Sequence, residues 1–275
     1  MIEPVTLSNT TKHVLHSGAA HDRFELWVGR PAPRMFSPSS EKPRVLYVLD
    51  ADLWFGVALE MTRLMHALFG ELPPHLVVGI AYGEPDWAKQ SALRTRDFTP
   101  TTHPKLGPAA SGPLAQTPMG RSSTFLEFLQ HEAVPFIDAR YDTEGAPRTL
   151  FGSSLGGLFT LWVYLTAPSA FSSFIAASPA IWWDDDMLFA LAARADPSRS
   201  NAYLHLCVGG LEEDPRLPML APFKMVTHAR KMRDTLLDVE GATPRVACDI
   251  IAEETHTSVL PIALTRGLRA LARVG

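Results

Sequence analysis

Short runs of apolar residues alternate with amphipathic stretches along most of this sequence. The clearest runs are RVLYVLD at residues 44–50, HLVVGIA at residues 75–81 and AYLHLCV at residues 202–208. Strands that are apolar throughout and alternate with helices are typical of a mostly parallel sheet covered by helices on both faces. The sequence therefore predicts an α/β fold, in which chemistry gathers at the carboxyl ends of the strands.

The same alternation predicts the position of each element. Strands are expected at residues 21–30, 44–50, 75–81, 148–152, 171–177, 202–208 and 244–251, and helices at residues 53–69, 125–138, 155–165, 184–195, 221–239 and 259–274. A stretch rich in Pro, Gly, Ser and Thr, residues 99–123, interrupts this rhythm without changing it. We therefore expect one domain over residues 1–275, with the 99–123 loop over the mouth of its site.

Composition excludes several classes of protein. The 25 Lys and Arg residues against 29 Asp and Glu residues give a net charge of −4, which provides no basic surface for nucleic acid or for an anionic membrane. No leader-like start and no apolar run of membrane-spanning length is present, so we expect a cytoplasmic protein. Cys207 and Cys248 are expected to be buried free thiols. The quaternary state is left open.

One predicted strand end carries the motif G-x-S-x-G, from Gly152 to Gly156 with Ser154 at its centre. Between a strand and a helix this motif forms a nucleophile elbow, a turn so tight that its central residue adopts strained backbone angles. The Ser154 hydroxyl would be exposed above the sheet. The amide of Leu155, at the start of the helix, would face the oxygen of a bound acyl group.

A serine hydroxyl needs a base within hydrogen-bond reach, and in this fold an acid and then a histidine follow the serine along the chain. His256 lies directly after the last strand, whereas His228 lies within a helix among basic residues, as a solvated surface residue would. The acid is expected after the strand at 202–208, where Glu212, Glu213 and Asp214 are adjacent. Position alone does not choose among these three. No metal or cofactor motif is present, so no cofactor is expected.

Several longer stretches resemble one known group. The segments YVLDADLWF (47–55), RTRDFTP (94–100), GSSLGGL (152–158), SPAIWW (178–183), VGGLE (208–212) and HTSV (256–259) resemble the motifs of the "putative esterase" branch of the α/β-hydrolases. This branch includes the ferric-siderophore (enterobactin and salmochelin) esterases and is related to the esterase D and mycolyltransferase families. The resemblance runs nearly end to end, although Ala51 replaces the glycine that the family has after the strand-end aspartate.

The resemblance implies roles for individual residues. Ser154 would be the nucleophile, His256 the general base and Glu212 the acid, with an oxyanion hole made by the backbone N–H groups of Leu155 and Asp52. Three further residues would contact the substrate: Trp182, Trp183 and Arg94. For the two tryptophans, core packing is an equal alternative. Arg94 and Arg96 would either pair with Asp97 as a clamp, which we favour, or bind an anionic substrate.

The predicted function is that of a serine esterase, a carboxylic-ester hydrolase that works through an acyl-enzyme on Ser154 and acts on a small-molecule ester. Three alternatives stay open: a ferric-siderophore esterase, an acyltransferase, and a binding module that lacks catalysis. Because a free imidazole loses its proton near pH 6 to 7, we expect the activity to rise with pH through that range.

Overall fold

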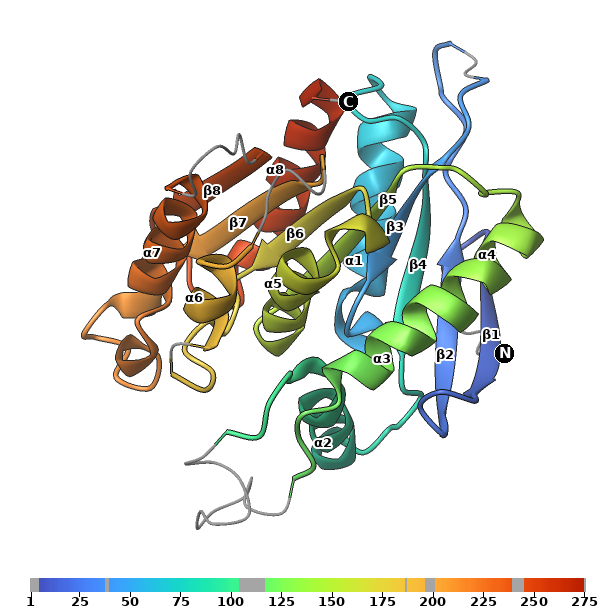
Figure 1. The fold of residues 1–275 in the computed structure, drawn as a ribbon. Helices are drawn as coiled ribbons and strands as arrows, with labels where there is room; N and C mark the ends of the chain where they lie inside the picture. Colours follow the sequence, from blue (N-terminus) through green and yellow to red (C-terminus); the bar gives the residue numbers. More distant parts are fainter. Residues whose placement is uncertain are drawn as a thin grey trace.

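The computed structural model describes residues 5–37, 40–103, 117–185, 187–195, 201–238 and 245–274. These residues form an eight-stranded sheet in the order β1-β2-β4-β3-β5-β6-β7-β8 (Figure 1). The strands are β1 (Thr10–Ser17), β2 (Asp22–Gly29), β3 (Arg44–Val48), β4 (His75–Ala81), β5 (Arg148–Ser153), β6 (Ser173–Ala177), β7 (Tyr203–Gly209) and β8 (Arg245–Ile251). β1 and β2 run antiparallel to their neighbours, and the strands from β4 to β8 in this order pair in parallel.

Helices cover both faces of the sheet. They are α1 (Ala51–Ala67), α2 (Trp87–Phe98), α3 (Ser122–Phe128), α4 (Val134–Tyr141), α5 (Leu155–Thr166), α6 (Met187–Ala192), α7 (Met225–Leu237) and α8 (Val259–Val274). α1 and α8 pack on one face, and α3 to α7 lie on the other (Figure 1). Every residue of β4, β6 and β7 is buried, as expected for strands covered on two sides. The predicted α/β-hydrolase architecture, a mostly parallel sheet between helices, is confirmed.

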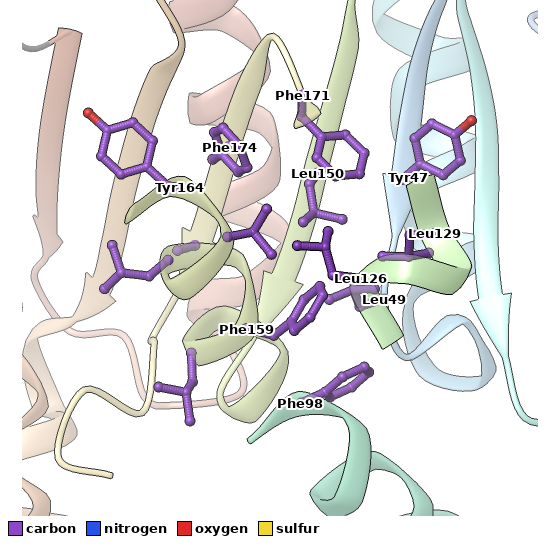
Figure 2. Close-up of a cluster of buried hydrophobic side chains, with 14 of the residues drawn as sticks. Tyr47, Leu49, Phe98, Leu126, Leu129, Leu150, Phe159, Tyr164, Phe171 and Phe174 are labelled. Carbon is purple, nitrogen blue, oxygen red and sulfur yellow. The ribbon is translucent and has the colours of Figure 1, made fainter. Parts of the chain in front are cut away.

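The larger of the two main core clusters contains most of the aromatic residues. Phe159 of α5 contacts the rings of Phe98 in α2 and Phe125 in α3, with ring centroids 6.0 and 5.1 Å apart. Figure 2 shows this cluster between α5, the sheet and the helices that follow the 99–123 stretch. The contacts fix α2, and with it the beginning of that stretch, beside the helix that follows Ser154.

Most predicted elements match the structure, and the differences have local causes. The expected helix at 125–138 is a longer helical run from α3 to α4, which contains a π-helical turn at Leu129–Ala133. Pro135, the second residue of α4, has no N–H to continue the regular ladder, which accounts for the turn. The expected helix at 221–239 is a 3₁₀ turn followed by α7, because Lys224 between them has a φ of 51°.

Two elements were not predicted, β1 and α2. The burial of β1 is irregular and α2 is mostly polar, so neither has a strong apolar pattern. Residues 104–116 of the expected loop lie outside the described residues, and its last two residues already belong to α3. Within the described ranges, no helix combines the length and apolar character needed to cross a bilayer.

Candidate active site

Ser154 lies in the tight turn between β5 and α5. Its backbone has φ 56° and ψ −116°, so the predicted strain of the elbow is confirmed. Gly152 has no room for a side chain, since a Cβ atom there would come within 2.2 Å of the Gly156 carbonyl oxygen. Gly157 is restricted less tightly, since a Cβ atom there would lie 2.9 Å from both the Ala177 carbonyl oxygen and Pro179 Cα. These glycines allow α5 to begin directly above the strand end, with Ser154 at its amino terminus.

Backbone strain gathers at the carboxyl ends of three neighbouring strands. Asp50 after β3, Ser154 after β5 and Ser178 after β6 have φ values of 51°, 56° and 41°. Residues other than glycine adopt such angles uncommonly, in turns and at functional sites, where the surrounding structure holds them. The observation directs attention to this edge of the sheet independently of the motif.

The structure joins His256 to one of the three acidic candidates. Glu212 lies in the 3₁₀ turn Gly210–Glu213 after β7, and its side chain is fully buried. Its Oε2 is 2.6 Å from His256 Nδ1, and its Oε1 accepts hydrogen bonds from the Gly209 N–H at 2.7 Å and from Ser178 Oγ at 2.5 Å. The buried carboxylate therefore has donors on both oxygens, as a charge removed from water requires.

The two neighbouring carboxylates have other partners. Glu213 accepts hydrogen bonds from the backbone N–H and hydroxyl of Thr227. Asp214 binds Arg216, whose hydrogen bonds lower the pKa of Asp214 to about 2. Of the three residues that the sequence left open, Glu212 is thus the one that contacts the imidazole.

A second close approach holds the histidine loop against the turn that carries Glu212. The Leu211 N–H donates to the Glu254 carbonyl oxygen at 3.0 Å. A Cβ atom on Gly209 would lie 2.4 Å from the same oxygen, so glycine is needed there. The Ser258 hydroxyl accepts from the Thr255 N–H and closes the turn around His256. The His256 side chain is 23% exposed, so the ring is held by Glu212 through Nδ1 and remains partly accessible to solvent.

Ser154 and the acid–base pair share one edge of the sheet. In the sheet register, Ser153 lies opposite Ala177, Ala177 opposite Cys207, and Gly209 opposite Ile251. The strand ends that precede Ser154, Glu212 and His256 are therefore aligned. The described contacts link Glu212 to His256 and include no hydrogen bond from the Ser154 hydroxyl to His256.

Arg94 has a different partner from the one predicted. Its Nε and Nη2 bind the Asp50 carboxylate at 3.0 and 2.9 Å, so the expected pair with Asp97 is wrong for Arg94. Arg96 does bind Asp97, and it binds Asp22 as well. Burial disfavours the charged guanidinium of Arg94, but the Asp50 carboxylate more than compensates and raises the pKa of Arg94. The substrate-binding role of Arg94 stays a prediction.

The Asp50–Arg94 pair lies next to the serine turn, because a Cβ atom on Gly156 would be 3.5 Å from Asp50 Oδ2. Asp50 also begins α1, and its carbonyl oxygen accepts from the N–H groups of Leu53 and Trp54. Burial raises the pKa of Asp52, and the buried Oδ2 of its side chain has no hydrogen-bond partner among the described residues.

Comparisons with known proteins agree with this architecture. The family model described as "Putative esterase" matches residues 31–244. The chain belongs to this esterase family. It is 30% identical to the ferri-bacillibactin esterase BesA of Bacillus subtilis, over 96% of this chain and 90% of that protein. It is 28% identical to the siderophore enterobactin esterase of Emericella nidulans, over 86% of this chain and 84% of that protein.

Solved structures show the same fold over the full length. The BES protein from Bacillus cereus has a TM-score of 0.82 at 26% identity, covering 99% of both chains. The siderophore hydrolase EstA from Aspergillus nidulans has a TM-score of 0.83 at 22% identity, covering 100% of this chain and 99% of that one. Together with the sequence relatives, these matches identify a carboxylic-ester hydrolase.

The two tryptophans of this esterase differ in their surroundings. Trp183 is 1% exposed and donates a hydrogen bond from Nε1 to the Thr101 carbonyl oxygen at 3.2 Å, so it packs in the core and fixes the start of the 99–123 stretch. Trp182 is half-buried and stacks on Phe223, with ring centroids 4.4 Å apart. Of the two alternatives, packing describes Trp183. The role of Trp182 in substrate binding stays a prediction.

Other candidate groups of the esterase lie outside this arrangement. His228 is half-buried against Phe189, which corrects the expectation of a solvated surface residue. Both thiols are free, and burial raises the pKa of Cys207 to about 12 and that of Cys248 to about 11. Among the described residues, no group of three or more His, Cys, Asp or Glu side chains is arranged to hold a metal ion. Sequence reasoning missed Ser178. The only feature of the sequence that could have indicated a role for Ser178 is its position directly after β6, at the start of the SPAIWW segment.

Proposed function

We propose that this esterase works through a triad of Ser154, His256 and Glu212. The observation that carries the proposal is the 2.6 Å contact between Glu212 Oε2 and His256 Nδ1, at the strand edge that also bears the strained Ser154. Because Nδ1 donates to the carboxylate, Nε2 is the nitrogen left to accept the Ser154 proton. Glu212 holds the ring in this tautomer and stabilises the imidazolium when it forms.

The reaction then follows in two halves. His256 Nε2 takes the proton from Ser154 Oγ while that oxygen bonds to the ester carbonyl carbon, and the imidazolium gives the proton to the departing alcohol. In the second half His256 takes a proton from water, the hydroxide oxygen bonds to the acyl carbon, and the bond to Ser154 Oγ breaks. The carboxylic acid leaves, and Ser154 regains its proton from His256.

The developing oxyanion needs two donors near Ser154. The Leu155 amide is the first N–H of α5, and such groups have no partner within the helix and carry part of the helix dipole. The second donor is the amide of Asp52, at the start of α1 beside the Asp50–Arg94 pair.

For the substrate, we propose an ester of a siderophore. The support comes from the relatives named for siderophore esters, which match at 30% and 28% identity over most of the chain. The half-buried stack of Trp182 and Phe223 provides aromatic surface next to the Ser178 segment, which suits a substrate with aryl groups. Of the two arginines considered for an anionic substrate, Arg94 is paired with the Asp50 carboxylate, whereas Arg121 donates to the neutral Ala20 carbonyl oxygen and keeps its positive charge.

The test is a hydrolysis panel on the wild type and the Ser154→Ala variant. It would include p-nitrophenyl butyrate, a sugar acetate and a siderophore triester with and without iron, with products identified by mass spectrometry. We expect turnover of the simple ester and the siderophore. Ser154→Ala should lower the rate by roughly four orders of magnitude without changing the fold. Substantial turnover by Ser154→Ala would overturn the proposed mechanism. Failure of the wild type to hydrolyse the siderophore triester would overturn the proposed substrate.

A further inference from the structure

A short segment at the carboxyl end of β6, residues 177–180, holds the turn that carries the nucleophile. The Ser154 N–H donates to the Ala177 carbonyl oxygen at 3.0 Å, and the Ser154 carbonyl oxygen accepts from the Ala180 N–H at 3.1 Å. Gly157 allows the segment to lie against the first turn of α5. Both backbone polar groups of Ser154 are therefore bound to one four-residue piece of chain.

Ser178 belongs to the same segment, but its contacts are with β7 and the turn that follows β7 rather than with Ser154. It is fully buried and has a φ of 41°. Its N–H donates to the Cys207 carbonyl oxygen at 2.7 Å, which ties it to β7. Its hydroxyl donates to Glu212 Oε1 at 2.5 Å. The backbone is thus held in a rarely adopted conformation, and a hydroxyl at this position meets a buried carboxylate.

The surroundings of Glu212 show what this hydroxyl supplies. Gly209 N–H and Ser178 Oγ share Oε1, which leaves Oε2 for His256. The other ionisable groups on this turn and at the end of β7, Glu213, Asp214 and Cys207, are all acids, so none of them can supply a positive counter-charge to Glu212. The carboxylate therefore depends on two neutral donors and on the imidazole.

We propose that Ser178 is a positioning residue for catalysis. Its hydroxyl fixes the Glu212 carboxylate so that Oε2 faces His256, and its segment ties this acid–base pair to the turn that carries Ser154. The proposal rests on the proposed function, because it assigns the pair its catalytic role. It goes beyond that function by adding a residue, outside the triad, that sets the geometry and charge of the triad.

The proposal predicts a specific effect on pH dependence. Without the hydroxyl, the buried Glu212 carboxylate loses one of its neutral donors and interacts more strongly with a charged imidazole. Protonated His256 is then favoured, and the rise of kcat/KM with pH moves to higher pH. A serine that only fills space would change stability and leave the pH of this rise unchanged.

The experiment compares Ser178→Ala, Ser178→Gly and a control, Ser173→Ala. Alanine and glycine both remove the hydroxyl, but glycine also relieves the positive φ, so an effect shared by both belongs to the hydroxyl. Ser173 is a buried serine at the other end of β6, and no described hydrogen bond involves its hydroxyl. We expect kcat on p-nitrophenyl butyrate to fall about 10- to 100-fold in both Ser178 variants, with KM nearly unchanged and the pH rise shifted upward by about 0.5 unit. Ser173→Ala should behave as the wild type.

A second readout does not depend on turnover. The proton between His256 Nδ1 and Glu212 should give a far-downfield proton NMR signal, assigned by its absence in His256→Gln, and this signal should shift in both Ser178 variants. An unshifted signal together with an unshifted pH rise would overturn the role of Ser178. High activity of Ser154→Ala would instead overturn the proposed function, and the NMR signal would still test the hold of Ser178 on the pair.

Discussion

The two ends of the parallel strands are built differently. At the carboxyl end, Asp50, Ser154 and Ser178 have positive φ, and a fully buried Glu212 binds His256. At the amino end, none of the residues directly before β3 to β7 has a positive φ. There the buried His75 donates from Nδ1 to the Pro73 carbonyl oxygen, and Arg148 binds Asp138.

This difference between the two strand ends indicates the site of chemistry more clearly than the size of a cavity does. A cavity of about 450 Å³ lies at the amino end, lined by the first residues of several strands. His75 lines it, but burial lowers the pKa of His75 to about 4, and none of the described residues that line the cavity is a carboxylate that could orient the ring. We therefore propose the active site at the strained and charge-paired edge rather than at this cavity.

The largest expected effect comes from replacing the proposed acid, Glu212, at the carboxyl end of the strands. Glu212→Gln should lower kcat/KM about 10³- to 10⁴-fold, because an amide can hold the imidazole in the wrong tautomer. Glu213→Gln and Asp214→Asn are matched controls on the same turn and should stay within a few-fold of the wild type. Steady-state kinetics on a p-nitrophenyl ester measures all three. A large loss in Asp214→Asn alone would show that the acid is misassigned.

The next effect concerns the Asp50–Arg94 pair. Arg94→Met leaves the Asp50 carboxylate, which is 2% exposed, without its cation and should cost about 3 kcal/mol of unfolding free energy. The double variant Asp50→Asn/Arg94→Met should recover much of this loss. Activity should stay low in both variants, because the loop that carries Asp52 is no longer fixed. Urea unfolding and kinetics would separate the two effects, and full activity in Arg94→Met would contradict the role of the pair.

The amino end should respond to pH through stability alone. The pKa of His75 in the folded state, about 4, is below the unfolded value of about 6.5. As pH falls from 7 to 4, the unfolded chain takes up a proton that the folded chain does not, so stability falls by about 2 to 3 kcal/mol. His75→Asn keeps a donor for Pro73 and should flatten this dependence. Equal slopes for both proteins, from urea unfolding at several pH values, would refute the assignment.

The smallest expected effect tests the two tryptophans. Trp183→Phe loses the hydrogen bond to Thr101 and should cost about 1 kcal/mol of stability with little change in KM. Trp182→Phe keeps an aromatic ring on Phe223 and serves as its matched control, whereas Trp182→Ala should raise KM for an aryl ester several-fold. If Trp183→Phe changed KM and Trp182→Ala did not, the two roles would be reversed.

Much of the fold follows from apolar patterning. The strand at residues 75–81 and the helix at residues 259–274 have the predicted bounds, because both are long and strongly patterned. α2 was missed because its sequence is mostly polar. The helix is stabilised by contacts with α3 and α5, which no local sequence pattern reveals. The same holds for the break before α7, which depends on one left-handed residue, Lys224.

For the site, local sequence and tertiary contact contribute different parts. The strained conformation of Ser154 follows from the glycines around it, and the place of His256 follows from the order of strands. The choice of Glu212 over its neighbours depends on a contact 44 positions along the chain, and that of Ser178 on one 34 positions away. Such contacts form only when parallel strand ends align in the folded protein, so no local sequence pattern reports them. Glu212 was indicated by the family resemblance alone, and Ser178 was overlooked.

The most direct test is covalent labelling with a fluorophosphonate, followed by intact-mass and peptide mass spectrometry. The account predicts one adduct, on Ser154, which is absent in Ser154→Ala and forms at least a hundred-fold more slowly in His256→Ala and Glu212→Gln. An unlabelled wild-type protein, or an adduct that forms at another serine or at the same rate in His256→Ala, would contradict the account.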